Sequence, residues 1–292
     1  NKLLLKYPFH KDERVLADAA SGLKELGGDL LGVEGGTCDA RMNAEGTDPS
    51  EGDVNNIDSR NSAQIKNLVT ITKDDRDRLL PGRCLNDELI NLWMCWISRN
   101  ESHQPNSNVH FFTTHFMPKL KDSGVDTILS WTKSVNVFEK KLIFVPVHAD
   151  EHWSLCVIVN PGLIGNSESE EHSFILFLDS KVGIHPSALY AKHIRDWLNC
   201  EWKRLGRGEV VVKGDRRVDD PFDTDTIVLI CPKTRQQKNG VDCGVFVCRN
   251  AYNLYIMRHQ SFSWDNLSGK EACKSMITKG VAFQFPPSDI AR

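Results

Sequence analysis

Hydrophobic and polar residues alternate with two different periods along the part of the chain that begins near residue 68. In the stretch LNDELINLWMCWISRN (85–100), five large apolar residues recur at helical spacing, namely Leu85, Leu89, Leu92, Trp93 and Trp96. This spacing predicts an amphipathic helix that is largely buried. The same reasoning predicts helices over 185–205, from about Asp242 onward, and over 264–282.

Three apolar runs of strand length lie in the middle of the chain, at 141–147, 152–159 and 173–179. A polar, turn-rich segment, NPGLIGNSESEEHS (160–173), joins the second run to the third and is typical of a surface loop between antiparallel strands. Strands gathered in the centre, with predicted helices before and after them, indicate the α+β class rather than an alternating doubly wound fold. The sequence therefore predicts a central, mainly antiparallel sheet flanked by helices.

Between residues 32 and 63, large apolar residues almost vanish and Gly, Asp, Asn, Glu and Ser dominate. A segment of this composition buries too little surface to offset the entropy that it would lose on ordering. We therefore predict an N-terminal segment (1–67) that carries a flexible acidic insertion, followed by an ordered domain (68–292). Because the chain begins with Asn rather than Met, we expect it to be a fragment of a longer protein.

Composition excludes several classes of function. The chain of 292 residues has a net charge of −3 and no compact run of Lys and Arg, so we expect neither nucleic-acid binding nor a membrane surface. No apolar stretch approaches the roughly 20 residues of a bilayer crossing, and the N-terminal apolar run is too short for a signal peptide. Nine cysteines are scattered without a C-x-x-C pair or a Cys/His cluster at zinc spacing. We therefore expect no metal, no cofactor and no disulfide framework, and a reducing compartment, the cytosol or the nucleus.

One cysteine, Cys243, stands at a predicted helix start in the segment QQKNGVDCG (236–244). Asp242 is a natural N-cap, whose side chain we expect to accept hydrogen bonds from the free amides of the first turn. The first turn favours a thiolate, because the helix dipole and the free N–H groups stabilise negative charge. Gly244 has no Cβ, so we expect a substrate to approach the sulfur closely. A buried structural cysteine is the alternative interpretation.

A nucleophilic thiolate needs a base, and the base needs an orienting group. His152 opens the predicted strand 152–159, and Trp153 beside it would form the wall of an apolar channel. His148 is a competing candidate for the base. Asp179 ends the next predicted strand. Because antiparallel neighbours place the end of one strand beside the beginning of the other, His152 and Asp179 are predicted to touch.

Gln237 is a candidate for a further catalytic function. A glutamine amide can donate a hydrogen bond to the oxyanion that forms on a scissile carbonyl, with the backbone N–H of Cys243 as the second donor. Taken singly, a residue such as Gln237 is more often a solvated loop residue, and one such as Asp179 is more often a turn acid at the end of a strand. The set Cys243, His152, Asp179 and Gln237 is a much stronger indication of a nucleophilic cysteine site than any one member.

The stretches that contain these residues resemble a known family, the ubiquitin-like-protein-specific cysteine proteases, also called sentrin or SUMO proteases. The matching stretches are LNDELINLWM (85–94), WTKSVNVFEKKLIFVPVHADEHWSLCVIV (131–159), ILFLDS (175–180) and QQKNGVDCGVFVC (236–248). The similarity runs from about Val69 to the last predicted helix. The insertions resemble those of the branch of the family that prefers poly-SUMO chains.

The resemblance implies a papain-like fold for a catalytic domain over 68–292. It carries a Cys-His-Asp triad onto Cys243, His152 and Asp179, and it assigns Gln237 to the oxyanion hole. The histidine of the family directly precedes a tryptophan, which favours His152 over His148.

The resemblance also implies substrate contacts. Trp153 matches a residue that helps to enclose the Gly-Gly tail of the substrate, and Asp87 matches a position that contacts the body of the modifier. Cys84 departs from the family, which usually has Trp or another aromatic residue there, so one wall of the tunnel is expected to be smaller. The loop 160–173 is longer than in compact members.

The implied function is that of a cysteine isopeptidase or endopeptidase that cleaves after the C-terminal Gly-Gly of SUMO, in deSUMOylation and in precursor processing. The implied partners are SUMO and SUMO-conjugated proteins, the expected location is nuclear or cytoplasmic, and the expected state is a monomer. Two alternatives stay open: a protease for Nedd8 or another ubiquitin-like modifier, and a module that binds SUMO without cleaving it.

Overall fold

The structure is a computed structural model, and it describes residues 71–99, 108–164, 171–212 and 216–258. These residues all belong to one compact unit, Asp58–Arg292. The predicted N-terminal segment 1–67 with its insertion, the predicted boundary at residue 68 and the predicted last helix 264–282 lie outside the described residues.

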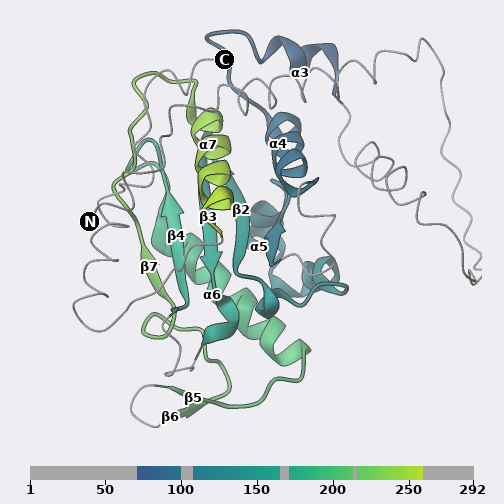
Figure 1. The fold of residues 1–292 in the computed structure, drawn as a ribbon, viewed down its shortest axis with the longest axis vertical. Helices are drawn as coiled ribbons and strands as arrows, with labels where there is room; N and C mark the ends of the chain where they lie inside the picture. The colour runs from purple at the N-terminus through teal and green to yellow at the C-terminus, as the bar shows by residue number, and fades with distance from the viewer. Residues whose placement is uncertain (1–70, 100–107, 165–170, 213–215, 259–292) are drawn as a thin grey trace, which may run out of the picture. The chain divides into compact units, whose positions relative to one another are not determined.

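A five-stranded sheet in the order β1-β2-β3-β4-β7 forms the centre of this unit (Figure 1). Its strands are β1 (Val109–Phe111), β2 (Leu142–Ala149), β3 (His152–Val159), β4 (Phe174–Leu178) and β7 (Val228–Ile230). The three central strands pair antiparallel, whereas β1 joins β2 and β7 joins β4 in parallel. The predicted α+β class is confirmed. Only the outer pairings are parallel, because long connections that contain helices separate those strands in the chain.

Helices cover both faces of the sheet (Figure 1). One face carries α4 (Asp87–Arg99) and α7 (Cys243–Ile256), and the other carries α5 (Phe116–Ser123) and α6 (Ser187–Arg204). The predicted helices over 85–100 and 185–205 are therefore confirmed, with slightly later starts. The helix predicted from about Asp242 begins at Cys243.

Alternation along β3 divides the apolar core into two clusters. Residues at odd positions face α4 and α7, namely Trp153, Leu155, Val157 and Val159, whereas Cys156 and Ile158 face α5 and α6. All eight residues of β3 are buried. The strand is a continuous apolar run because helices cover it on both sides.

Short elements complete the described part of the unit. Helix α3 (Lys73–Asp77) begins at a capping box formed by Thr72 and Asp75. Strands β5 (Val210–Val212) and β6 (Arg216–Val218) form a separate antiparallel pair. Single 3-10 turns occur at η2 (Val125–Thr127), η3 (Leu129–Thr132), η4 (Val137–Glu139) and η5 (Pro161–Leu163).

Candidate active site

The turn between β2 and β3 determines where His152 lies. Two residues connect the strands, Asp150 and Glu151, and both have positive φ, 49° and 55°. This is the backbone geometry of a type I′ turn, whose twist matches that of the two strands. The pairing register places Ala149 opposite His152. His152 is thus the first residue of β3, at the end of the sheet, and it is 3% exposed.

Asp179 directly follows β4 on the neighbouring strand. The register pairs Leu155 with Leu178, so its continuation places Asp179 opposite Ser154. His152 is then the diagonal neighbour of Asp179 on the same face of the sheet, within reach of a longer side chain. Nε2 of His152 lies 2.7 Å from Oδ1 of Asp179. The predicted contact between the two residues is confirmed.

Several further hydrogen bonds hold Asp179 in place. Its Oδ1 accepts a bond from the backbone N–H of Lys181 at 2.9 Å. Its backbone carbonyl accepts from Oγ1 of Thr234 at 2.6 Å and from Nε2 of Gln236 at 3.0 Å. The hydrogen bonds to its side chain and to its backbone carbonyl therefore keep the Asp179 carboxylate in position to contact His152.

Cys243 is the first residue of α7 and is 2% exposed. Asp242 occupies the N-cap position, but its side chain makes no capping hydrogen bond, so that part of the prediction is wrong. Its φ of −88° and ψ of 0° differ from the extended conformation that aims an N-cap side chain at the first turn. Oδ2 of Asp242 instead accepts from Nδ2 of Asn239 at 2.8 Å.

The thiol of Cys243 and the imidazole of His152 interact, and each shifts the pKa of the other. Because Nε2 of His152 contacts Asp179, the other ring nitrogen, Nδ1, is the one that serves the thiol. Burial alone would lower the pKa of His152, but the hydrogen bonds to Asp179 and Cys243 and the charges of both groups raise it to about 9. The imidazole therefore favours its protonated form at neutral pH.

The pKa of Cys243 shifts in the opposite direction from that of an ordinary buried cysteine. Burial would raise it, but hydrogen bonds from His152 and from the backbone N–H groups of Trp153 and Gly244 lower it below its usual value. Burial raises the pKa of the Cys156 thiol to about 12. The environment of Cys243 thus stabilises a thiolate, which a purely structural cysteine does not require.

Gln237 lies in the loop before α7 and is held against the residue that follows Asp179. Its backbone N–H donates to the carbonyl of Ser180 at 2.9 Å. Its side-chain Oε1 accepts from the Ser180 hydroxyl at 2.7 Å, and its Nε2 donates to the carbonyl of Asn239 at 2.7 Å. The loop with the candidate oxyanion donor is therefore attached to the segment with the candidate acid.

Trp153 packs beneath the loop that leads into α4. It is 3% exposed, and its indole N–H donates to the carbonyl of Leu85 at 3.1 Å. The ring of His148 lies 4.3 Å from it, centroid to centroid, and His148 is exposed. The structure pairs His152, and not this competing histidine, with Asp179. Cys84, directly before Leu85, is exposed.

Gly244 and Asp87 occupy different environments. A Cβ on Gly244 would lie 2.8 Å from Cβ of Leu85 and 3.3 Å from Cδ1 of Ile90. The interpretation that the missing Cβ leaves room for substrate is therefore wrong, because side chains of the protein fill this space. Asp87 is the first residue of α4 and is half-buried.

His185 is a buried neighbour of the site that the sequence did not reveal. Its Nε2 lies 2.9 Å from the carbonyl of Ala149 and therefore donates, so its Nδ1 accepts from the Ser154 hydroxyl at 2.7 Å. Its ring centroid lies 5.0 Å from that of His152. Burial lowers the pKa of His185, which keeps a second cation away from the His152 imidazolium. No local pattern distinguishes this residue, which stands at the start of a predicted helix.

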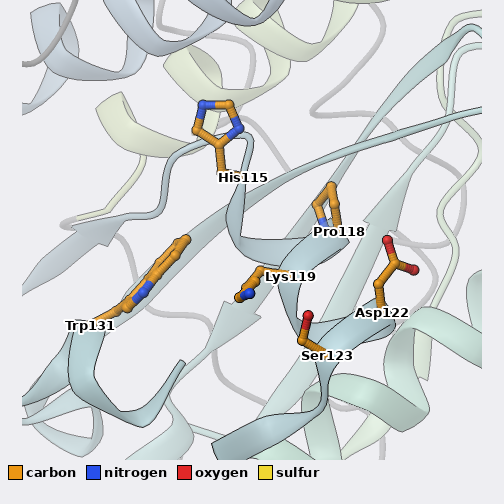
Figure 2. Close-up of a pocket in the computed structure, with 6 residues that line it drawn as sticks. All are labelled: His115, Pro118, Lys119, Asp122, Ser123 and Trp131. Carbon is orange, nitrogen blue, oxygen red and sulfur yellow. The ribbon is translucent and has the colours of Figure 1, made fainter. Parts of the chain in front are cut away.

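Other features of the described residues are not part of this cluster. Figure 2 shows a shallow surface pocket along α5 and beside Trp131, lined by His115, Pro118, Lys119, Asp122, Ser123 and Trp131. Within the ranges that the structure describes, no group of three His, Cys, Asp or Glu residues is arranged to hold a metal ion. In the same ranges, no helix is both long and apolar enough to cross a membrane.

The protein has a cysteine at a helix start beside a buried His–Asp pair, on an α+β fold. This arrangement places it in the class of papain-like cysteine peptidase folds. Residues 83–278 match the Ulp1 protease family, C-terminal catalytic domain. The chain belongs to this family.

Individual relatives agree with this assignment. The chain is 30% identical over 194 residues to probable ubiquitin-like-specific protease 2A of Arabidopsis thaliana. The aligned region covers 61% of this chain and 24% of the relative. It is 31% identical over 199 residues to sentrin-specific protease 2 of Pongo abelii. This alignment covers 67% of this chain and 29% of the relative. A crystal structure of the de-sumoylating protease has a similar fold, with a TM-score of 0.53 at 21% identity over 74% of this chain and 76% of that chain. The chain thus spans less than a third of the length of these two curated relatives.

Proposed function

We propose that the protein is a cysteine isopeptidase and endopeptidase that cleaves after the C-terminal Gly-Gly of SUMO. One observation carries the proposal: His152 lies 2.7 Å from Asp179 and interacts with Cys243, and the pKa of the Cys243 thiol is lowered. A thiolate, a protonated imidazole and an orienting carboxylate are the groups that acyl transfer to cysteine requires.

The first half of the reaction forms an acyl-enzyme. The Cys243 proton resides on Nδ1 of His152, and the sulfur attacks the carbonyl carbon of the C-terminal glycine. The carbonyl oxygen becomes an oxyanion that accepts hydrogen bonds from the Gln237 amide and from the backbone N–H of Cys243. His152 then donates its proton to the departing amine, a lysine ε-amine in a conjugate, and the C–N bond breaks.

The second half restores the enzyme. A water molecule gives a proton to the neutral His152 and attacks the thioester carbonyl, and the oxyanion forms again at the same donors. The C–S bond breaks and the sulfur leaves as a thiolate while His152 keeps the proton from the water, which restores the thiolate–imidazolium pair. The glycine carboxyl group departs and loses its own proton to solvent. Asp179 keeps Nε2 of His152 occupied throughout, so Nδ1 is always the nitrogen that faces the sulfur.

The substrate class follows from the surroundings of the nucleophile and from the relatives. The indole of Trp153 donates to the Leu85 carbonyl, and the backbone of Trp153 helps to lower the pKa of Cys243. We place the tail, which has no side chains, beside these groups. The similar proteins are named sentrin-specific and de-sumoylating proteases. We assign Trp153 and Gly244 to the binding of the Gly-Gly tail, Gly244 through its backbone, and Asp87 to the body of the modifier.

The same assignment extends to partners and location. SUMO and SUMO-conjugated proteins are the proposed partners, with poly-SUMO chains as the preferred form, and a monomer as the working unit. A reducing compartment, the nucleus or the cytoplasm, would keep the Cys243 thiolate active.

Activity-based probes test this function. SUMO, Nedd8 and ubiquitin, each with a C-terminal electrophile, are incubated with the wild type, with Cys243→Ser and with Cys231→Ser. Cys231 is an exposed cysteine outside the site, so its variant is a matched control. We expect the SUMO probe to label the wild type and Cys231→Ser but not Cys243→Ser.

Each other outcome has a definite meaning. Labelling by the Nedd8 probe alone would replace SUMO with Nedd8 as the substrate. Binding of SUMO without labelling by any probe would identify a non-catalytic module and would end the protease proposal.

A further inference from the structure

Ser180 and Gln237 are joined at two points although 57 positions separate them in the chain. The backbone N–H of Gln237 donates to the carbonyl of Ser180 at 2.9 Å. The hydroxyl of Ser180 donates to Oε1 of Gln237 at 2.7 Å. Ser180 is 2% exposed, so water does not compete well for this hydroxyl.

The nitrogen of the Gln237 side-chain amide is bonded to a group that can only accept hydrogen bonds. Nε2 donates to the backbone carbonyl of Asn239 at 2.7 Å. A flipped amide would place Oε1 against that carbonyl oxygen, and the two acceptors would repel each other. The amide therefore has one favourable orientation, with its oxygen toward Ser180 and its nitrogen toward Asn239. One N–H of the amide is used by Asn239, and the second N–H remains for another acceptor.

The backbone around this contact is held independently of the Ser180 hydroxyl. Thr234 and Gln236 donate to the carbonyl of Asp179, and the N–H of Val182 donates to Oε1 of Gln236 at 3.0 Å. Loss of the Ser180 hydroxyl alone therefore leaves the loop attached and frees only the Gln237 amide.

We propose that Ser180 is a positioning residue for the oxyanion donor, whose hydroxyl holds the Gln237 amide with one N–H free for the developing oxyanion. The proposal rests on the function assigned above, in which Gln237 is that donor. Neighbouring residues then serve two different catalytic groups, because Asp179 orients the base and Ser180 orients the oxyanion donor.

The test compares Ser180→Ala, Gln237→Ala and the double variant on a SUMO substrate with a fluorogenic leaving group after Gly-Gly. Loss of an oxyanion donor typically lowers kcat about 10²–10³-fold, which we expect for Gln237→Ala. We expect Ser180→Ala to lower kcat about 10-fold, the effect of one neutral hydrogen bond, with little change in KM. The double variant should match Gln237→Ala, because an absent amide has nothing to orient.

Two controls separate positioning from general damage. Alkylation of Cys243 by chloroacetamide needs the thiolate but forms no oxyanion, so its rate should be the same in Ser180→Ala and the wild type. Ser154→Ala removes another buried hydroxyl that bonds to His185 rather than to Gln237. Its effect on kcat should multiply with that of Gln237→Ala.

The outcomes distinguish this inference from the function on which it rests. An unchanged kcat in Ser180→Ala, multiplicative losses in the double variant, or an equal loss of alkylation would each overturn the role of Ser180 while the protease function stands. A wild type that cleaves no Gly-Gly substrate would overturn both. If Ser180→Ala does not fold, Ser180→Thr and Ser180→Val replace it. These two side chains have nearly the same shape, and only threonine has a hydroxyl. Equal kcat values for the two variants would also overturn the inference.

Discussion

Nε2 of His152 and Oδ1 of Asp179 lie 2.7 Å apart in a buried contact that joins two strands, although 27 positions separate the residues in the chain. Their side chains are 4% and 9% exposed. Water screens so buried a pair weakly, so the carboxylate acts strongly on the charge of the imidazole and, through it, on the thiol. The charge state of the site therefore depends on this contact.

Asp179→Asn should remove most of the activity without unfolding the protein. The amide keeps the shape but not the charge, so burial would dominate and lower the pKa of His152 from about 9. We expect kcat to fall on the order of 10³-fold or more, with a small change in KM. NMR titration of the His152 ring should show the lower pKa. Glu151→Gln, an exposed carboxylate beside His152, is the matched control and should leave both quantities near wild type; an unchanged pKa in Asp179→Asn would contradict the role of the carboxylate.

Gly244→Ala should destabilise the protein by disturbing the contact between α7 and the start of α4. The new Cβ would lie 2.8 Å from Cβ of Leu85, which cannot move away as a side-chain tip can. Overpacking of this kind costs about 1–3 kcal/mol in free energy of unfolding, measurable by urea denaturation. Gly240→Ala is the control, because a Cβ at Gly240 meets nothing within 4 Å and should change stability by less than about 0.5 kcal/mol. Equal effects of the two substitutions would refute this account of Gly244.

His110 should make the protein less stable in mild acid. Burial, together with the charge of Lys140, lowers its pKa from 6.5 to about 4. Because the unfolded state binds the proton more readily, this contribution is complete above pH 6.5 and is lost as the pH falls toward 4. Between about pH 7.5 and about pH 5 the free energy of unfolding should fall by about 2 kcal/mol through this group. His110→Gln removes the titration, so urea denaturation of this variant should show a smaller fall; the same slope as wild type would exclude His110 as the source.

Glu201 should contribute far more to stability than an exposed acid on the same helix. Its side chain is 0% exposed and accepts from Nε of Arg204 at 2.9 Å and from Nη2 at 2.6 Å. Its other oxygen accepts from the hydroxyl of Thr132, which links α6 to η3. Glu201→Ala leaves these donors without their acceptor and should cost about 3 kcal/mol in free energy of unfolding.

The exposed ion pair on the same helix supplies the comparison for Glu201. Lys192 and Asp196 are 67% and 46% exposed and lie 2.6 Å apart. Asp196→Ala should cost no more than about 0.5 kcal/mol, because water screens the pair. Thermal or urea denaturation of both variants checks the difference, and equal losses would show that burial of Glu201 does not matter.

Local sequence patterns were enough to predict most helices and strands and the contact between two residues of the candidate site. Helices α4, α6 and α7 and the three central strands follow from local periodicity, because the spacing of apolar residues depends only on the period of each element. The contact between His152 and Asp179 was also predictable, since hairpin topology brings the end of one strand to the start of the next.

Other contacts depend on how the elements pack, because no local period encodes them. Gly244 was expected to admit substrate, but Leu85, far away in the chain, fills the space. The hydrogen bond of Ser180 to Gln237 joins residues whose spacing follows no period. Such partners meet only when separate elements pack against one another, and so the sequence determined which groups are present while the packed fold decided how they are oriented.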